Sequence, residues 1–282
     1  MQKAIPIVLL FLMACGPELK DLPISDQFKQ HEIIGKSGSK LLQEASGLAA
    51  SFANPGYLWT HNDSGGEPAL YLIDEQGDLA LTVNLEGATN YDWEDLTITR
   101  DGSGILYVGD IGDNRAIRKR LAIYRISEPT LDSASEVTVN ATRMTIQYAE
   151  GARDAETLMV DPFNGNLIIL TKREAQIMFY DFPFEEGPVT VTSKGTIDVT
   201  KVTAGDINQR GDVLFKSYDQ VFYLKNEDKM PITQLLLRGE MNLIEYEVEK
   251  QGEALTWGVD GQSFFLLSEW NENLPQPLYR YY

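Results

Sequence analysis

A short acidic phrase recurs five times in this chain, each time just before an apolar residue. The copies read EASGL, DWEDL, DAETL, TAGDI and QGEAL, and they end at Leu48, Leu96, Leu158, Ile207 and Leu255. Carboxylates that converge need a cation or a shared proton, because like charges disfavour ionisation. The chain has one cysteine and two histidines, so its oxygen donors suit Ca²⁺ or Mg²⁺ better than Zn²⁺ or Cu²⁺. The phrases therefore predict a divalent-cation site, with Ca²⁺ as the expected ion.

Six carboxylates are the candidate metal ligands. Four belong to the phrases and two to the polar run GDIGDN; they are Glu94, Asp95, Glu156, Asp206, Asp110 and Asp113. Each phrase also has an architectural interpretation, in which the carboxylate accepts backbone N–H bonds and holds a loop. GDIGDN is equally typical of a tight Asx-type turn without a ligand.

Other polar and aromatic residues are candidates for ligand binding or catalysis. His61 and Glu253 are the candidate general bases. The predicted ligand contacts are Asp63, Trp93, Arg153, Lys172 and Lys216. The basic members could bind an anion or simply neutralise the acids. Trp93 and Trp270 are candidate sugar-stacking platforms, whereas Trp59 and Trp257 lie within strand-like runs and are expected in the core.

Several catalytic signatures are missing from the sequence. There is no Gly-rich phosphate loop before a helix, no G-x-S-x-G motif and no recognisable serine triad. Catalysis would therefore depend on carboxylates, a metal-activated water or His61.

The elements that must position these residues repeat with the phrases. The intervals between the aligned residues are 48, 62, 49 and 48. Each unit holds about four strand-like runs separated by Gly- and Asn-rich turns, which is typical of a propeller blade. The expected fold is an all-β, five-bladed β-propeller; a six-bladed interpretation stays open because the second unit is longer. Loops entering the first strand and joining the second and third strands should share one face, the mouth.

The last unit lacks its outer strand, and a spare strand-like run lies at the other end, over Gln30–Lys36. The sequence thus predicts closure of the ring by an N-terminal strand, which removes open sheet edges. Ile232–Arg238 is predicted as the outer strand of the fourth unit, and the region of Leu243–Lys250 as either a turn of helix or part of a long connection.

The net charge of −18 argues against nucleic acid as a partner, because phosphate binding needs a basic surface. A small molecule, a glycan or a protein remains as the ligand, and a monomer is expected.

The N-terminus is typical of an export signal. Lys3 precedes an apolar run that is too short for an ordinary membrane span. Its end, LMACG, resembles the lipobox of bacterial lipoproteins, which implies lipidation of Cys15. The predicted organisation is a signal peptide (1–14), a tether (15–26) and a propeller domain (27–282). By resemblance to lipoprotein sorting rules, Gly16 favours the outer membrane of the cell envelope.

Five motifs resemble those of an uncharacterised family of secreted bacterial β-propeller proteins. They are NDSG, DWEDL, GDIGDN, DAETL and TAGD. The resemblance implies the propeller fold and lends no activity; more distantly, the phrases are similar in type to those of phytase-like and lactonase-like propellers. The expected function is a lipid-anchored envelope protein that binds a ligand, with a divalent cation, at its acidic mouth. The alternative is a metal-assisted hydrolase of phosphoesters, lactones or glycosides.

Overall fold

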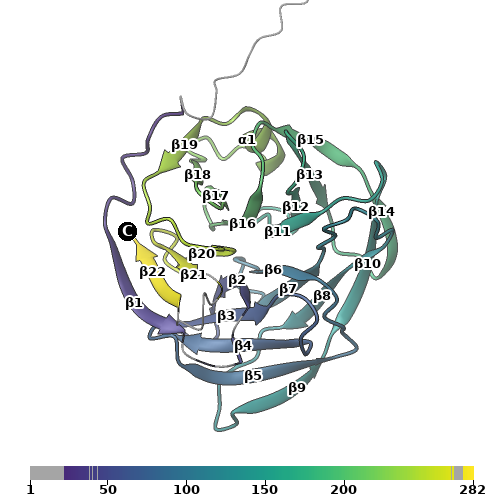
Figure 1. The fold of residues 1–282 in the computed structure, drawn as a ribbon, viewed down its shortest axis with the longest axis vertical. Coiled ribbons are helices and arrows are strands. Elements are labelled where there is room, and N and C mark those ends of the chain that lie inside the picture. Colours follow the sequence, from purple (N-terminus) through teal and green to yellow (C-terminus); the bar gives the residue numbers. More distant parts are fainter. Residues whose placement is uncertain (1–21, 38, 40, 43, 268, 270–275) are drawn as a thin grey trace, which may run out of the picture.

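The computed structural model describes residues 22–282 apart from 38, 40, 43, 268 and 270–275. It is a five-bladed β-propeller with one short helix, so the predicted fold class and blade number are confirmed (Figure 1). The predicted signal peptide (1–14) and Cys15 lie outside the described residues. No helix in the described part of the chain is long and apolar enough to cross a membrane.

Each blade contains four antiparallel strands in the order inner to outer. Blade 1 is β2 (Ala45–Ala50), β3 (Tyr57–Asn62), β4 (Ala69–Asp74) and β5 (Leu79–Glu86); blade 2 is β6 (Trp93–Ile98), β7 (Ile105–Asp110), β8 (Leu121–Ser127) and β10 (Thr142–Tyr148). Blade 3 is β11 (Ala155–Val160), β12 (Leu167–Thr171), β13 (Ile177–Phe182) and β15 (Ser193–Ile197); blade 4 is β16 (Val202–Ile207), β17 (Val213–Ser217), β18 (Val221–Leu224) and β19 (Met241–Ile244). Blade 5 is β20 (Ala254–Trp257), β21 (Phe264–Leu267), β22 (Gln276–Tyr281) and β1 (His31–Ser37).

The core lies between neighbouring blades. The inner strands β2, β6, β11, β16 and β20 contact one another around the ring and are buried on both faces. An outer strand such as β15 alternates instead between exposed and covered residues. Trp59 and Trp257 are fully buried, as expected of core residues.

The ring closes as predicted. β1 pairs antiparallel with β22, with His31 opposite Tyr281 and Ser37 opposite Gln276. The N-terminal strand therefore supplies the outer strand of the last blade, and Figure 1 shows β1 beside the C-terminal strand.

The blade edges carry additional segments that the sequence analysis missed. β9 (Glu136–Asn140) pairs parallel with β5, and β14 (Gly187–Val191) pairs parallel with β10. The helix α1 (Ile232–Arg238) packs on β15, and residues 23–25 pair with β19 through Leu243. Each of these segments directly precedes the outer strand of the next blade. They cover sheet edges that would otherwise offer unpaired backbone groups.

Ile232–Arg238 is a helix, so its prediction as a strand is wrong. The outer strand of blade 4 is β19, and the residues between Ile244 and Ala254 form a connection and not a helical turn, in agreement with the second of the two alternatives for that region. Ile232, Leu235 and Leu236 are buried together, which matches the spacing of one helix face. A short apolar run does not by itself distinguish a buried strand from such a helix.

Candidate functional site

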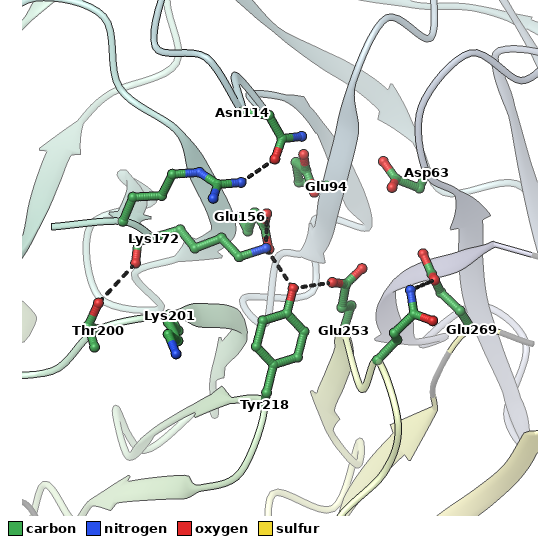
Figure 2. Close-up of a pocket in the computed structure, with 12 residues that line it drawn as sticks. Asp63, Glu94, Asn114, Glu156, Lys172, Thr200, Lys201, Tyr218, Glu253 and Glu269 are labelled. Carbon is green, nitrogen blue, oxygen red and sulfur yellow. Dashed lines mark hydrogen bonds and ion pairs between the residues drawn. The ribbon is translucent and has the colours of Figure 1, made fainter. Parts of the chain in front are cut away.

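A pocket of about 600 Å³ opens on the mouth face, where the acidic phrases and the loops between second and third strands meet (Figure 2). All five blades contribute to it. Its lining residues are Asp63, Glu94, Asn114, Glu156, Lys172, Arg173, Thr200, Lys201, Tyr218, Gln251, Glu253 and Glu269. Seven carboxylates gather there when Asp92 and Asp154, which lie beside the lining, are included.

β-bulges place two of these carboxylates in the mouth. In blade 2, Trp93 pairs with Asp110 and Asp95 pairs with Gly109, so Glu94 is an extra residue in β6. Glu156 occupies the same bulged position in β11 of blade 3. A bulge changes the direction of a side chain and interrupts the ladder locally. Both glutamates thereby line the pocket although their strands are otherwise buried.

Glu94 is the centre of the acidic cluster. Its oxygens lie within 4.8 Å of those of Asp63 and Asp92 on one side and of Asp154 and Glu156 on the other. Glu94 is only 4% exposed, and its carboxylate makes no hydrogen bond to any described residue. Burying an unpaired carboxylate is costly, so this group needs a proton or a cation.

Glycine at position 112 makes room for this cluster. A Cβ atom added to Gly112 would lie 1.9 Å from Oε1 of Glu94 and 2.6 Å from Oδ2 of Asp92. The GDIGDN loop therefore contributes by close backbone approach to the acids.

A hydrogen-bonded chain crosses the pocket from blade 3 to blade 5 (Figure 2). The Lys172 ammonium donates to Oε1 of Glu156 and, at 2.8 Å, to the hydroxyl of Tyr218. The Tyr218 hydroxyl donates to Oε1 of Glu253 at 2.8 Å. Oε2 of Glu156 is buried and has no partner among the described residues.

Burial and mutual repulsion keep the acids of the mouth prone to protonation. Burial, with the charges of Glu253 and Asp92, raises the pKa of Asp63 to about 7. Burial raises the pKa of Glu156 to about 8, although the Lys172 charge opposes this. Burial, followed by the charge of Glu156, raises the pKa of Glu94 well above its ordinary value.

The same effect reaches Glu269, where burial and then the charge of Glu253 raise the pKa to about 8. Shifts of this kind in several neighbouring carboxylates mark a functional-site candidate.

Basic residues form the opposite wall. Arg173 donates to Asp154 and to the amide oxygen of Asn114. Burial lowers the pKa of Lys172, but its pairing with Glu156 and Tyr218 outweighs this, so its pKa is raised overall and the ammonium stays charged. Lys201 makes no ion pair within the described residues, and its backbone N–H donates to the carbonyl of Lys172 at 2.7 Å.

Asp95 lies outside the pocket and connects two blades. Its carboxylate accepts the backbone N–H groups of Leu96 and Leu158, both at 2.9 Å. It thus matches the architectural alternative raised from the sequence.

Asp206 has a similar role between blades 4 and 5. Oδ2 accepts from the Arg100 guanidinium, from Thr256 Oγ1 at 2.9 Å and from the Trp257 N–H at 2.9 Å. Arg100 and Asp206 form a buried ion pair, with side chains 1% and 6% exposed. These partners occupy the carboxylate away from the pocket.

The fourth phrase was aligned wrongly in the sequence. Ile207 forms the last pair of the inner hairpin of blade 4, and the residue at the same position in blade 2 is Ile98. The alignment of the phrases had instead placed Ile207 at the position of Leu96. Asp206 is therefore two residues farther along its strand than Asp95, which explains why it does not reach the mouth.

The two acids of GDIGDN stabilise their own loop. Asp110 pairs with Arg118 at 2.7 Å and accepts the N–H of Asp92 at 3.1 Å. Asp113 accepts the N–H of Arg118 at 2.6 Å, and its own N–H donates to Asp154 at 2.8 Å. Neither belongs to the groups of converging carboxylates, so the loop acts as the turn alternative describes.

His61 and Trp93 are both fully buried beneath the mouth. The Trp93 indole N–H donates to the carbonyl of Thr89 at 2.9 Å, so Trp93 is a core residue and its prediction as a sugar platform is wrong. Trp270 lies outside the described residues. Nδ1 of His61 contacts the carbonyl of Asn62 at 2.9 Å, and burial lowers the histidine pKa to about 4. His61 is therefore neutral and does not line the pocket.

Two predicted basic contacts lie away from the pocket. Arg153 pairs with Glu174 at 3.4 Å. Lys216 is fully buried; it donates to the carbonyl of Gly252 at 2.5 Å and lies 3.4 Å from Glu249. Lys216 thereby holds the loop that carries Glu253 into the mouth.

Sequence reasoning identified Asp63, Glu94, Glu156, Lys172 and Glu253 among the residues that the structure brings together. It did not select Asp92, Asp154, Tyr218 or Glu269. Asp92 and Asp154 begin two of the phrases and so lie two residues before the bulged glutamates. That spacing was the available signal.

No family model and no curated protein matches the chain. Among solved structures, the allergen Mala s 1 of Malassezia sympodialis is similar in fold, with a TM-score of 0.58, 9% identity, and coverage of 88% of this chain and 95% of that one. A gluconolactonase of Xanthomonas campestris gives a TM-score of 0.46 at 14% identity over 84% of this chain and 71% of that one. The WD40 domain of Neurospora crassa Pan2 gives 0.47 at 9% identity over 92% and 97%. At these identities the likeness concerns the propeller fold alone.

Proposed function

We propose that the protein binds a divalent cation, Ca²⁺, at the acidic mouth and uses it to hold a ligand there. Glu94 carries the proposal, because it is a buried carboxylate without a hydrogen-bond donor, placed between two further pairs of acids. The ligand set would be Glu94 with Asp154 and Glu156, or Glu94 with Asp63 and Asp92, because these are the two groups whose oxygens converge on Glu94. All donors are carboxylate oxygens, which hard cations prefer.

The unpartnered Oε2 of Glu156 supports the same assignment. A carboxylate oxygen that coordinates a cation does not also need a hydrogen-bond donor. An oxygen at the pocket wall without a donor among the described residues therefore fits a metal ligand. Lys172 occupies only the other oxygen of this carboxylate.

Calorimetry of EDTA-treated protein with Ca²⁺ tests the proposal. We expect one binding event per chain and a higher melting temperature with Ca²⁺ than with Na⁺ at equal ionic strength. Glu94→Gln should abolish both effects. Asp95→Asn is the matched control, because Asp95 is adjacent in sequence but faces the backbone of blade 3. Absence of heat and of any thermal shift in the wild-type protein would refute cation binding.

The chain Glu156–Lys172–Tyr218–Glu253 favours a metal-assisted hydrolase as the second candidate. Glu253 would be the general base, and Tyr218 would orient it and exchange a proton with it. A bound cation would supply Lewis-acid polarisation of the scissile ester or phosphoester.

A screen of lactones, phosphoesters and aryl glycosides in the presence of Ca²⁺ addresses this candidate. For any activity found, Tyr218→Phe should lower kcat and Glu253→Gln should lower it further. Full activity in Glu253→Gln would eliminate the proposed base while leaving cation binding untouched.

We further propose that Cys15 is lipidated and anchors the protein to the outer membrane of the cell envelope. The lipobox-like sequence before Cys15 supports this. Mass spectrometry of the N-terminal peptide should show acyl chains on Cys15, and Cys15→Ser should release the protein from the membrane fraction. An unmodified Cys15 in the membrane-purified protein would contradict the proposal.

A further inference from the structure

A second pocket lies at one end of the outer part of blade 2, where residues 116–121 face the end of β10 and the loop after it; Figure 1 shows β8 and β10 side by side. Its volume is about 560 Å³, within the range of small-molecule sites. Ile117, Leu121, Tyr148 and Ala152 form much of its apolar wall. Tyr148 is 3% exposed and packs on Tyr180 with ring centroids 4.4 Å apart.

The charge of this pocket is opposite to that of the whole protein. Among the described residues, its lining includes Arg118 and Lys119 and no acidic residue, in a chain with 42 acidic and 24 basic residues. Lys119 lies in the segment 115–120, RAIRKR, which holds four basic side chains. Within the described residues, Arg115, Lys119 and Arg120 make no ion pair, so their charges remain available.

The loop that carries these residues is a fixed structure. The N–H of Ala116 donates to the carbonyl of Asp113 at 2.7 Å, and Ala116 adopts a positive φ of 50°. Arg118 is held by Asp110 and by the carbonyl of Gly112, and its guanidinium lies 4.5 Å from the centroid of the Tyr91 ring.

Within this fixed loop, Ile117 is 67% exposed at the edge of the pocket. The loop therefore presents an aliphatic side chain, Ile117, and one unpaired cation, Lys119, beside an apolar cavity.

We infer that this pocket binds an anionic amphiphile, a molecule with an apolar chain and a carboxylate or phosphate head. The chain would enter between Ile117, Leu121 and Ala152, and the head would remain at the rim with Lys119. Apolar walls without a basic rim would not select the head group, and a basic rim alone would not hold the chain. A free fatty acid and an anionic phospholipid share this chemistry.

Binding is tested on the full chain carrying Cys15→Ser, so that no covalent acyl chain competes. The probes are decanoate, decyltrimethylammonium and inorganic phosphate, each below any micelle-forming concentration, with calorimetric detection. Decanoate should bind at one site per chain, and the other two probes at least about tenfold more weakly, which corresponds to about 1.4 kcal/mol. Equal binding of the anionic and cationic amphiphiles would overturn the inference.

Two variants locate the site. Ala152→Trp should fill the pocket and abolish decanoate binding. Lys119→Glu should weaken it about fivefold or more, whereas Lys194→Glu, the same charge change on the exposed face of β15, should not. Circular dichroism and Ca²⁺ binding at the mouth should be unchanged in all three. Wild-type decanoate affinity in Lys119→Glu would overturn the inference even if Ala152→Trp failed to fold.

Flotation with vesicles distinguishes the two sources of the ligand. Binding to vesicles of phosphatidylglycerol, but not of phosphatidylcholine, that is lost in Lys119→Glu and blocked by decanoate would identify a membrane lipid. Binding of decanoate without vesicle capture would identify a free fatty acid. Vesicle binding that persists in Lys119→Glu would contradict the inference.

Discussion

Protonation of His61 should control the acid stability of the propeller. The ring is fully buried, its Nε2 has no partner among the described residues, and its pKa is lowered from 6.5 to about 4. Between these two values the unfolded chain binds a proton that the folded protein excludes, so stability rises with pH in this window and falls as the solution is acidified. The lowered pKa of His61 contributes about 3 kcal/mol to the free energy of unfolding when the ring is fully neutral, and roughly 2 kcal/mol of this is lost between pH 7 and pH 5.

His61→Asn is the perturbation that isolates this contribution. The asparagine amide can keep the hydrogen bond to the carbonyl of Asn62 but does not titrate. The variant should be less stable at pH 7, because it loses the packing of the ring against Trp93, whose centroid lies 5.6 Å away. The informative quantity is therefore how the difference in free energy of unfolding between the wild-type protein and the variant changes with pH. This difference should be smaller at pH 5 than at pH 7 by roughly 2 kcal/mol.

Urea unfolding followed by tryptophan fluorescence at pH 7, 6 and 5, in EDTA at constant ionic strength, measures this difference. The carboxylates of the mouth titrate in both proteins, so their effect largely cancels in the comparison. Because the chain has only two histidines, the ring protons of His61 can also be followed directly by NMR. Parallel pH profiles for the two proteins, or a His61 ring that titrates above pH 6 in the folded state, would refute the reasoning.

Three further outcomes follow from the carboxylates. Asp206→Asn should destabilise the protein by about 3–5 kcal/mol in urea unfolding, because it leaves the buried Arg100 without its charge partner. Glu94→Gln should instead stabilise the metal-free protein at pH 8. Equal effects of the two substitutions on the free energy of unfolding would contradict the separation of structural acids from mouth acids. Gly112→Ala should weaken Ca²⁺ binding by about tenfold or more with circular dichroism unchanged, because the added methyl group collides with Glu94 and Asp92; unchanged affinity measured by calorimetry would place the cation elsewhere. Ca²⁺ at 100 times its Kd should raise the free energy of unfolding by about 2.7 kcal/mol, and EDTA should reverse this in the same urea titration.

The sequence predicted the ring well because its inner strands obey strong local rules. The phrases recur at the entrance of each inner strand, and the turns between strands contain Gly and Asn, so the blade count and the closing strand β1 followed directly. The edge segments were harder. β9 and β14 pair with the sheet of another blade, and nothing in their local sequence indicates a partner so distant along the chain.

The candidate site was predicted only in part, because acidic side chains that are adjacent in sequence point in different directions. Glu94 and Asp95 are adjacent in one phrase, yet Glu94 faces the pocket and Asp95 holds the backbone of blade 3. The bulge in β6 determines that Glu94, and not Asp95, faces the pocket, and the sequence of the phrase does not reveal where the bulge lies. Tyr218 was missed for another reason: its role depends on Lys172 and Glu253, which come from two other blades.

The closing strand also determines when the domain can be completed during synthesis. Of the described strands, β1 is synthesised first, and its partner β22 is synthesised last. Residues 23–25 likewise cannot pair until β19 has been synthesised. Blades 2 and 3 can form their own sheets as they appear, whereas blade 5 stays open until the final strand is available. A nascent chain therefore exposes the unpaired edge of β1 until β22 has been synthesised, so the last blade depends on the two most distant strands of the described chain.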